Sequence, residues 1–398
     1  MTDGAENTMT IDPPADASGP LTSLRVIELA GIGPGPFAAM MLADMGATVI
    51  RVDRIEAVPD ERPDGAHPDI LNRGRRSIAV DLKSEEGRRV VLDLVATADV
   101  LIEGFRPGVT ERLGLGPDAC LARNPRLVYG RMTGWGQSGP MASLAGHDIN
   151  YIALTGALHA CGRADGRPVP PMNLVGDFGG GGLMLAFGAI AAVLEARISG
   201  RGQVVDAAMV DGASVLTTAI HGLRNRGIWS SGRGQNLLDT GAPFYEVYEC
   251  ADEKYVAVGA IEPQFHAELV RLTGMSQENL PPNRMDPEGW AGAKKRWAEL
   301  FLTKTRDEWV ELAGMSDACL APVLDWDEAA QHPHLAARQT FVEHAGVLQP
   351  APAPRFDATP GRIQRPAPHP GDHTDDVLSE VGMHTEAIAS LRAAGTVR

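Results

Sequence analysis

The sequence predicts an α/β protein with a parallel sheet in a large first domain and a smaller α+β domain after it. Short β-branched segments alternate with helical segments over the first half of the chain, which is typical of a parallel sheet covered on both faces. The length of 398 residues exceeds what one hydrophobic core usually organises, so two domains are expected. The alternation ends near residue 226, where antiparallel strands are indicated.

The first strand–helix–strand unit begins at residue 24. The segment LRVIEL is rich in β-branched residues and predicts a strand, which ends in the turn AGIGPGP. The following FAAMMLADMG has helical composition and stops at Gly46, and ATVIRVD predicts the second strand.

The alternation then continues through the first half of the chain. SIAVDL predicts a strand, Ser84 is a plausible N-cap for the helical EEGRRVVLDLVATA, and DVLIEGF predicts the next strand. RLVYGRMTGWG predicts a strand with a loop after it, and QVVDAAM predicts another strand between two helices. All of these strands are expected in one sheet.

The second half of the chain has a different pattern. APFYEVYECADEKYVAVGA predicts antiparallel strands with a turn at ADEK, and amphipathic helical stretches continue to about residue 330. Residues 349–370 are rich in proline and are therefore expected to be extended, before a final helical segment. We expect a disordered tail at 1–20, a large domain at 21–225, a small domain at 235–330 and a C-terminal segment at 331–398.

Composition and charge exclude several classes of protein. The formal net charge of −15 argues against nucleic acid as a partner, because nucleic-acid-binding proteins present a basic face. The four cysteines form no C-x-x-C pair, and the acidic N-terminus has no apolar core of a secretory signal. GGGGLMLAFGAIAAVLEA opens on four glycines and gains a charge at Glu195, so we expect a buried helix and no membrane partner. These observations predict a cytoplasmic location.

The turn GIGPGP raises the alternative of a dinucleotide-binding loop. Gly31 and Gly33 follow a strand as that motif requires, but Pro36 stands where the third glycine would allow close contact between helix and strand. Asp53 lies at about the right distance to bind a ribose, yet it stands between Arg51 and Arg54, an arrangement that suits phosphate better. The motif therefore does not favour a nicotinamide or flavin cofactor.

Basic residues at predicted strand ends indicate a ligand with several phosphates. Arg54, Lys83 and Arg106 each follow a different strand, and Arg112 is close behind. Ligands of an open parallel sheet lie outside the carboxyl ends of its strands, where these four cations would converge. Each of them singly has the alternative of being a solvated charge at the start of a loop.

Three separate residues could carry acid–base chemistry. His147 stands in GHDINY before an apolar run, Asp177 precedes four glycines and a long apolar helix, and Glu262 follows a predicted strand of the small domain. A structural hydrogen-bonding histidine and a helix-capping aspartate are the ordinary alternatives. Together the three supply a neutral base, a carboxylate and a second carboxylate able to orient an imidazole. The glycines could also leave backbone N–H groups bare for a developing negative charge.

Two other kinds of site are not supported by the sequence. GQSGP lacks the second glycine of a serine nucleophile elbow. His332 and His334 lack the i, i+4 spacing of a helical metal pair, and Pro333 argues against a helix through both, so we expect a surface loop and no metal site.

Long motifs in order along the chain resemble the family III CoA-transferase superfamily, and within it the α-methylacyl-CoA racemases. The resemblance covers nearly everything from about Leu21 onward. It rests on RVIELAGIGPGPFAAMMLADMGATVIRVDR, DVLIEGFRPGVTERLGLGP, RMTGWGQSGP, AGHDINY, GDFGGG, VAVGAIEPQF and HTDDVLSEVG.

The resemblance implies a Rossmann-like large domain that binds CoA, with the C-terminal segment rejoining it, and an interlocked homodimer. Each active site would lie between the large domain of one subunit and the small domain of the other. His147, Asp177 and Glu262 fall on the catalytic positions. The positions that fall on the CoA-binding motifs are Arg54, Val80, Asp81, Leu82, Lys83, Gly104, Phe105, Arg106, Arg112, Gly146, Asp148, Ile149, Asn150 and Tyr151.

The histidine separates the activities within this superfamily. The transferases use the aspartate at the position of Asp177 as a nucleophile and generally have an aromatic or apolar residue at the position of His147. An aspartate facing a histidine favours proton removal on one side of a carbon and delivery on the other. We therefore expect racemisation of a 2-methylacyl-CoA thioester at C2 without a metal or redox cofactor. The alternatives are CoA transfer to a carboxylate and a non-catalytic protein that binds CoA thioesters.

Overall fold

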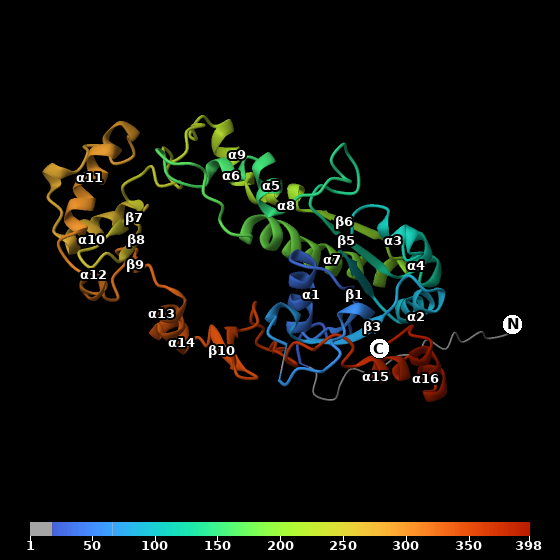
Figure 1. Ribbon diagram of the computed structural model, residues 1–398. Coiled ribbons are helices and arrows are strands. Elements are labelled where there is room, and N and C mark those ends of the chain that lie inside the picture. Colours follow the sequence, from blue (N-terminus) through green and yellow to red (C-terminus); the bar gives the residue numbers. More distant parts are fainter. Residues whose placement is uncertain (1–17, 66) are drawn as a thin grey trace. The chain divides into compact units, whose positions relative to one another are not determined.

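The computed structural model describes residues 18–65 and 67–398, which form two compact units (Figure 1). The large unit consists of the described residues up to Ile152 together with Met172–Leu216 and Gln339–Arg398, and the small unit consists of Ala153–Pro171 and Thr217–Arg338. Segments 153–171, 217–225 and 331–338, which were expected outside the small domain, thus belong to the small unit. Of the expected tail, residues 1–17 lie outside the described residues.

A six-stranded parallel sheet organises the large unit, which confirms the predicted fold class. Its strand order is β3-β2-β1-β4-β5-β6, the order of the Rossmann fold. The strands are β1 (Arg25–Leu29), β2 (Thr48–Arg54), β3 (Arg75–Val80), β4 (Val100–Glu103), β5 (Val128–Thr133) and β6 (Val204–Ala208). Because the order reverses between β1 and β4, the loops that follow these two strands diverge and leave room for a ligand at the carboxyl edge.

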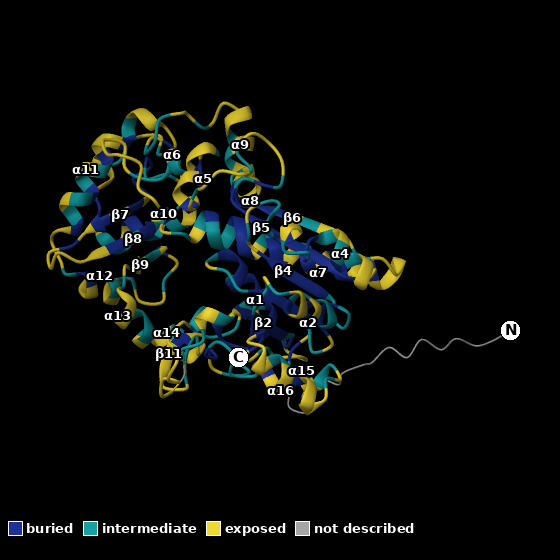
Figure 2. Ribbon diagram, turned by 45° about the vertical axis from the view of Figure 1, so that its right-hand side comes forward, coloured by how far each residue is buried: buried dark blue, intermediate teal, exposed yellow. Residues whose placement is uncertain are grey.

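Helices cover both faces of this sheet (Figure 2). Successive residues of a strand point to opposite faces, so Val26 packs with α1 (Pro34–Asp44) and α7 (Met184–Ser199). Its neighbour Ile27 packs on the other face with α2 (Glu85–Val95) and α15 (Thr374–Glu380). The remaining elements of the large unit are η1 (Ile55–Ala57), η2 (Ile70–Asn72), α3 (Val109–Arg112), α4 (Pro117–Arg123), α5 (Asp148–Leu154, which continues into the small unit), η3 (Leu174–Leu183), α8 (Met209–Leu216), β10 (Phe341–His344), β11 (Val347–Pro350) and α16 (Thr385–Ala393).

The predicted N-cap of α2 is confirmed. The Oγ of Ser84 accepts a hydrogen bond from the backbone N–H of Gly87 at 3.0 Å, which satisfies one donor of the first turn. Glu85 and Glu86 follow in that turn, where their negative charges suit the positive end of the helix.

η3 and α7 form one continuous helical stretch of 26 residues, Leu174–Ser199, whose length and composition would allow it to cross a membrane. One face packs against β5 and β6, with Leu185 and Ala189 in the core, so the predicted burial of this helix holds for that face only. The opposite face is exposed and apolar. We call it the α7 stripe; it consists of Leu183, Phe187, Ile190, Leu194 and Ile198.

The C-terminal segment packs along β3 of the large unit. The N–H of His373 donates to the carbonyl of Ser77, and the N–H of Arg398 donates to the carbonyl of Ala79. Val397 forms an isolated antiparallel bridge with Val80. The hairpin of β10 and β11, which the sequence did not predict, leads into the proline-rich part, and residues 351–370 contain neither helix nor strand.

The small unit is an antiparallel sheet with helices, as predicted. The order of its strands is β7-β8-β9, and β7 and β8 are joined by the expected turn. Its core holds Trp297, Phe301 and Trp309. The elements are α6 (Ala157–Ala160), α9 (Thr218–Asn225), β7 (Tyr245–Glu249), β8 (Tyr255–Gly259), α10 (Pro263–Thr273), η4 (Gln277–Asn279), η5 (Pro287–Gly289), α11 (Trp290–Phe301), α12 (Arg306–Ala313), β9 (Leu320–Pro322), α13 (Trp326–Gln331) and α14 (Pro333–Ala337).

The expected surface loop around His332 and His334 is wrong. α13 ends at Gln331 and α14 begins at Pro333, so His332 joins two helices and His334 lies inside the second. Pro333 does prevent one helix from running through both histidines, but its fixed φ suits the first turn of a new helix. Within residues 18–65 and 67–398, no group of three or more His, Cys, Asp or Glu residues is placed to hold a metal.

Candidate active site

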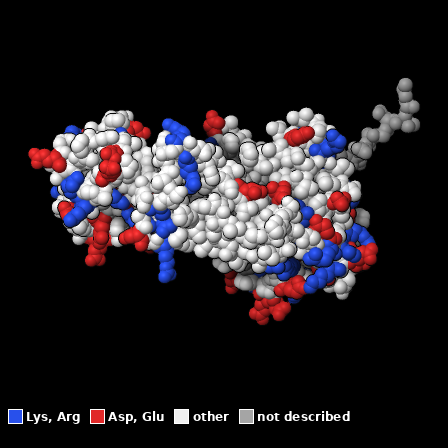
Figure 3. Space-filling view, turned by 90° about the horizontal axis from the view of Figure 1, so that it is seen from above, with Lys and Arg blue, Asp and Glu red and all other residues white. Residues whose placement is uncertain are grey.

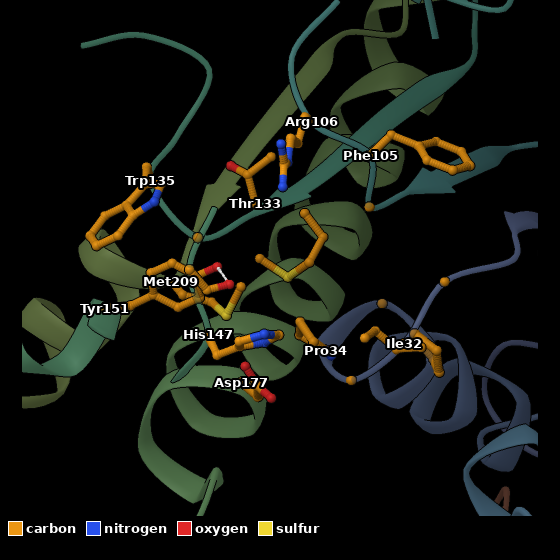
Figure 4. Close-up of a pocket in the computed structure, with 18 of the residues that line it drawn as sticks. Ile32, Pro34, Phe105, Arg106, Thr133, Trp135, His147, Tyr151, Asp177 and Met209 are labelled. Carbon is orange, nitrogen blue, oxygen red and sulfur yellow. Dashed lines mark hydrogen bonds between the residues drawn. The ribbon is translucent and has the colours of Figure 1, made fainter. Parts of the chain in front are cut away.

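A cavity of about 600 Å³ opens in the large unit at the carboxyl ends of β1, β4 and β5 (Figure 4). Its walls come from the loops after these three strands, from the start of α5 and from η3, with Met209 of α8. This is the edge where the sheet order reverses, so the cavity lies where ligands of this fold bind. The predicted residues His147, Asp177, Arg106 and Tyr151 all line it.

Asp177 projects into the cavity from a π-helix. The sequence placed it just before a helix, but η3 already begins at Leu174, so Asp177 lies in the first turn. One carboxyl oxygen, Oδ2, accepts a hydrogen bond from the side-chain amide of Asn173 at 3.3 Å. π-helical turns are rare and are found frequently at functional sites. The composition of the segment did not signal one.

The glycines that follow Asp177 serve packing and do not form a bare anion site. A Cβ on Gly180 would lie 2.6 Å from the N atom of Ala213, and a Cβ on Gly212 would lie 1.7 Å from the carbonyl oxygen of Gly180. η3 and α8 therefore approach each other backbone to backbone, which only glycine allows. The expectation that these glycines stand at a helix start with free N–H groups is also wrong, because η3 begins at Leu174 and the four glycines lie inside it.

His147 stands at the loop end just before α5, and its side chain is exposed to the cavity. Its own N–H donates to Oδ1 of Asn150 at 3.0 Å, and its carbonyl accepts from the N–H of Asn150 at 2.8 Å. This reciprocal pair fixes the backbone of His147 at the start of the helix. Figure 4 shows the imidazole beside the carboxyl of Asp177, with the two side chains facing each other.

The surroundings of Asp177 favour its protonated form. Partial burial raises the pKa of the Asp177 carboxyl, the nearby charge of Asp148 raises it further, and the amide of Asn173 and the charge of His147 lower it. A carboxyl group with a raised pKa retains its proton to higher pH than usual, which suits a group that must return a proton. The pair of His147 and Asp177 thus combines an imidazole with a carboxyl whose proton is retained more strongly than usual.

Tyr151 and Asp148 are buried, and their side chains contact the protein. The hydroxyl of Tyr151 donates to the carbonyl of Gly146, and its ring meets Trp135 edge to face at 4.7 Å between centroids. Oδ1 of Asp148 accepts a hydrogen bond from the N–H of Asp177 at 2.7 Å. Ile149 is exposed.

Glu262 lies in the small unit, at the N-cap position of α10, and its side chain is exposed. It lies three positions after the last residue of β8, and Pro263 provides the first residue of the helix. Its role as the partner of His147 stays a prediction.

The predicted phosphate-binding cations lie at or after the carboxyl ends of neighbouring strands. Arg54 ends β2 and is exposed, Arg106 follows β4 and lines the cavity, and Arg112 ends α3. Lys83 follows β3, and its Nζ lies 3.8 Å from a carboxylate oxygen of Glu56, with both side chains exposed. On the face shown in Figure 3, basic and acidic side chains are interspersed.

The side chains of Val80, Asp81 and Leu82, which precede Lys83, contact the protein. Val80 is buried beside Val397, and Leu82 packs against the core. Oδ1 of Asp81 accepts a hydrogen bond from the N–H of Lys83 at 3.0 Å, which fixes the turn. The side chains of Val80 and Leu82 therefore hold this turn in place.

A buried acidic residue that the sequence did not single out supports the loop Gly104–Arg106. Oε2 of Glu103 accepts from the N–H of Phe105 at 2.7 Å, and Oε1 accepts from Nε of Arg131 at 2.9 Å. Burial raises the pKa of Glu103 to about 7. Its place at the last residue of a predicted strand, directly before a predicted binding loop, was the available signal.

Asp53 is buried among protein partners, so ribose binding, which the sequence already disfavoured, is not supported. It is buried, Oδ1 accepts from Nε of Arg51 at 3.0 Å, and Oδ2 accepts from the hydroxyl of Ser77 at 2.7 Å. Arg51 also donates to Glu28 at 2.8 Å, and Glu28 pairs with the fully buried Arg75. Asp53 and Arg51 thus neutralise each other inside the protein, and Arg54 alone of the RVDR segment remains exposed.

Comparison with known proteins agrees with this geometry. The family model of CoA-transferase family III matches residues 21–374. The chain is 45% identical to an alpha-methylacyl-CoA racemase of the mouse over 94% of this chain and 96% of that protein. It is 32% identical to an acetyl-CoA:oxalate CoA-transferase of Acetobacter aceti, over 86% of this chain and 90% of that protein. A CAIB/BAIF family protein from Brucella suis has a similar structure, with a TM-score of 0.79, 26% identity and coverage of 92% of this chain and 100% of that one.

Proposed function

The chain belongs to CoA-transferase family III, and on this premise we propose that it is an isomerase that racemises 2-methylacyl-CoA thioesters at C2. The observation that carries the proposal is the pair of His147 and Asp177, which face each other in one cavity. They come from different elements, so a carbon placed between them would be accessible to each from an opposite side.

The proposed reaction is a 1,1-proton transfer through an enolate. Neutral His147 takes the C2 proton from one face, and the electron pair of the C–H bond moves into the thioester to form the enolate. Protonated Asp177 then delivers its proton to the other face of C2, which leaves the opposite enantiomer, an imidazolium and a carboxylate. The roles exchange for the reverse direction. The reaction requires only these two side chains and the thioester, so we propose no metal or redox cofactor.

The enolate requires nearby hydrogen-bond donors. The N–H of His147 is used by Asn150 and the N–H of Asp177 is used by Asp148, which removes both from the candidate donors. The N–H groups of Gly146 and Asp148 are the remaining candidates in this turn.

We propose further that the protein is an interlocked homodimer in which the partner subunit's Glu262 orients His147. The α7 stripe supports a second copy as the occupant of this face, because five large apolar side chains follow one another at helical spacing. The side chain of Glu262 is exposed in its own unit, so it is accessible to another subunit. The cytoplasmic location stays a prediction.

The test is proton NMR of a single-enantiomer 2-methylacyl-CoA in deuterium oxide, with acetate present as an acceptor. Racemisation predicts loss of the C2 proton signal together with formation of the other enantiomer. The variants His147→Gln and Asp177→Asn should each lose racemisation and exchange the C2 proton of one enantiomer only, opposite for the two variants, because each keeps one base. His384→Gln is the matched control, since His384 is exposed at the N-cap of α16.

CoA transfer is the alternative that the more distant relatives favour. Retention of the C2 proton while acetyl-CoA appears would establish it, with Asp177 as the nucleophile. Binding of the thioester with neither reaction would identify a non-catalytic binding protein.

A further inference from the structure

Asp148, the residue directly after His147, contacts the helix that carries the other base. Its side chain is almost completely buried, with 7% of its surface exposed. Oδ1 accepts the hydrogen bond from the N–H of Asp177 at 2.7 Å. Two neighbouring residues thus have different contacts: His147 presents its imidazole to the cavity, and Asp148 binds the backbone of Asp177 through its carboxylate.

The N–H of Asp177 needs a partner from outside its own helix. The first N–H groups of a helix have no acceptor within it, and Asp177 is the fourth residue of η3. The N–H of the next residue, Phe178, already uses the carbonyl of Asn173. Asp148 thus caps a donor that would otherwise be buried without a partner, and this bond fixes the backbone of Asp177.

Gly176 allows this close approach. A Cβ at position 176 would lie 2.2 Å from Oδ1 and 2.8 Å from Cγ of Asp148, so no side chain fits there. The other carboxylate oxygen, Oδ2, is buried and has no hydrogen-bond partner among the described residues. The negative charge of Asp148 is therefore held beside Asp177 with little screening by solvent.

We propose that Asp148 is a positioning residue that sets the distance between His147 and Asp177 and holds a carboxylate against the backbone of Asp177. The proposal rests on the proposed function, because it requires Asp177 to act as an acid and a base. It gives the carboxylate of Asp148 a role distinct from CoA binding, which the resemblance assigns to this stretch of sequence.

The remaining groups around Asp177 do not duplicate this role. His147 and Tyr151 interact with it electrostatically, and the amide of Asn173 donates to it. Of the packed elements, α8 carries Asp211, which is exposed, and α1 carries Asp44, which is paired with Arg73. The charged residues of α7 (Glu195 and Arg197) and of β6 (Asp206) are exposed, and Arg131 of β5 is paired with Glu103. Asp148 is the buried carboxylate whose charge raises the pKa of Asp177.

The test compares Asp148→Asn, which keeps an acceptor oxygen and removes the charge, with Asp148→Ala, which removes both. In Asp148→Asn, the acidic limb of the kcat/KM profile should shift to lower pH in both reaction directions, because Asp177 then loses its proton more readily. In Asp148→Ala, kcat should fall by about 100-fold, the effect of misplacing a reacting group by about 1 Å. Asp325→Asn is the matched control, because Asp325 caps α13 of the small unit in the same way, accepting from the N–H of Glu328 at 2.8 Å.

Hydrogen–deuterium exchange provides a readout that does not depend on activity. Peptides that cover residues 172–183 should exchange faster in Asp148→Ala than in the wild-type protein and should be unchanged in Asp148→Asn. An unmoved acidic limb in Asp148→Asn, or unchanged exchange in a folded Asp148→Ala, would overturn the proposal. If the wild-type protein does not exchange the C2 proton, the proposed function fails, and the amide exchange still decides whether Asp148 fixes this helix.

Discussion

The contact between η3 and α8 predicts opposite effects for two glycine-to-alanine substitutions in helices. In Gly212→Ala the new methyl group would lie 1.7 Å from the carbonyl oxygen of Gly180. An ordinary carbon–oxygen contact is about 3.5 Å, so the helices would have to separate by about 2 Å. Overpacking costs about 1–3 kcal/mol or more, and only about 1 kcal/mol returns from the better helix propensity of alanine. In Gly222→Ala no atom lies within 4 Å of the new Cβ, so only the gain in propensity remains.

We therefore expect Gly212→Ala to lower the free energy of unfolding by about 2 kcal/mol, and Gly222→Ala to raise it by about 0.5–1 kcal/mol. At about 2–4 °C per kcal/mol, the melting temperature of Gly212→Ala should fall by about 4–8 °C. Because η3 carries Asp177, its kcat should fall as well. Urea titration followed by circular dichroism, together with the NMR assay of C2 exchange, measures both effects. Equal unfolding free energies for the two variants would refute the backbone-to-backbone contact.

Two further predictions concern the loop Gly104–Arg106, which we propose binds CoA, and the α7 stripe. Glu103→Gln should raise the KM for the thioester about tenfold, because a charge-assisted hydrogen bond to the loop is lost, while kcat stays close to wild type. Since the pKa of Glu103 is raised to about 7, the wild-type KM should rise as the pH falls through about 7 and the carboxylate gains a proton, whereas that of the variant should not; steady-state kinetics between pH 6 and 8 decides this. Phe187→Asp should convert a dimer into monomers in light scattering, with the exposed Met315→Asp as control; an unchanged mass for Phe187→Asp would contradict the assignment of the stripe to a second copy.

The strands of the large unit could be predicted from the sequence, because the pattern that marks a strand spans only a few neighbouring residues. LRVIEL and ATVIRVD bury both faces, so they read as short apolar runs, and the glycine and proline between them mark the turn. The same reasoning located Ser84 as a cap, since capping depends on residues three apart. His147, Asp177 and Arg106 were predicted from positions beside strand and helix ends, and the structure brings all three into one cavity.

The sequence-based predictions failed where the role of a residue depends on a contact with a residue far away in the sequence. The arginines on both sides of Asp53 were expected to suit phosphate, but Arg51 pairs with Asp53 and Glu28 inside the protein, and the hydroxyl of Ser77, remote in the sequence, donates to Asp53. The glycines after Asp177 were considered as possible donors to a negative charge, because the sequence does not show that Gly180 contacts Gly212, some thirty positions further on. Short-range patterns carry no information on such pairs.

The sequence by itself determined the α/β class, the succession of strands along the chain and the residue types available for proton transfer. It could do so because hydrophobic periodicity and turn chemistry act over a few residues. Only the tertiary structure decided which carboxylates are ligand-facing and which are internal, because this depends on packing between elements. Asp148 and Asp177 show the difference. Both follow apolar or glycine-rich turns in the sequence, yet the fold buries one against the backbone N–H of the other and leaves Asp177 facing the cavity. Burial and the neighbouring charge then raise the pKa of Asp177, which no local pattern specifies.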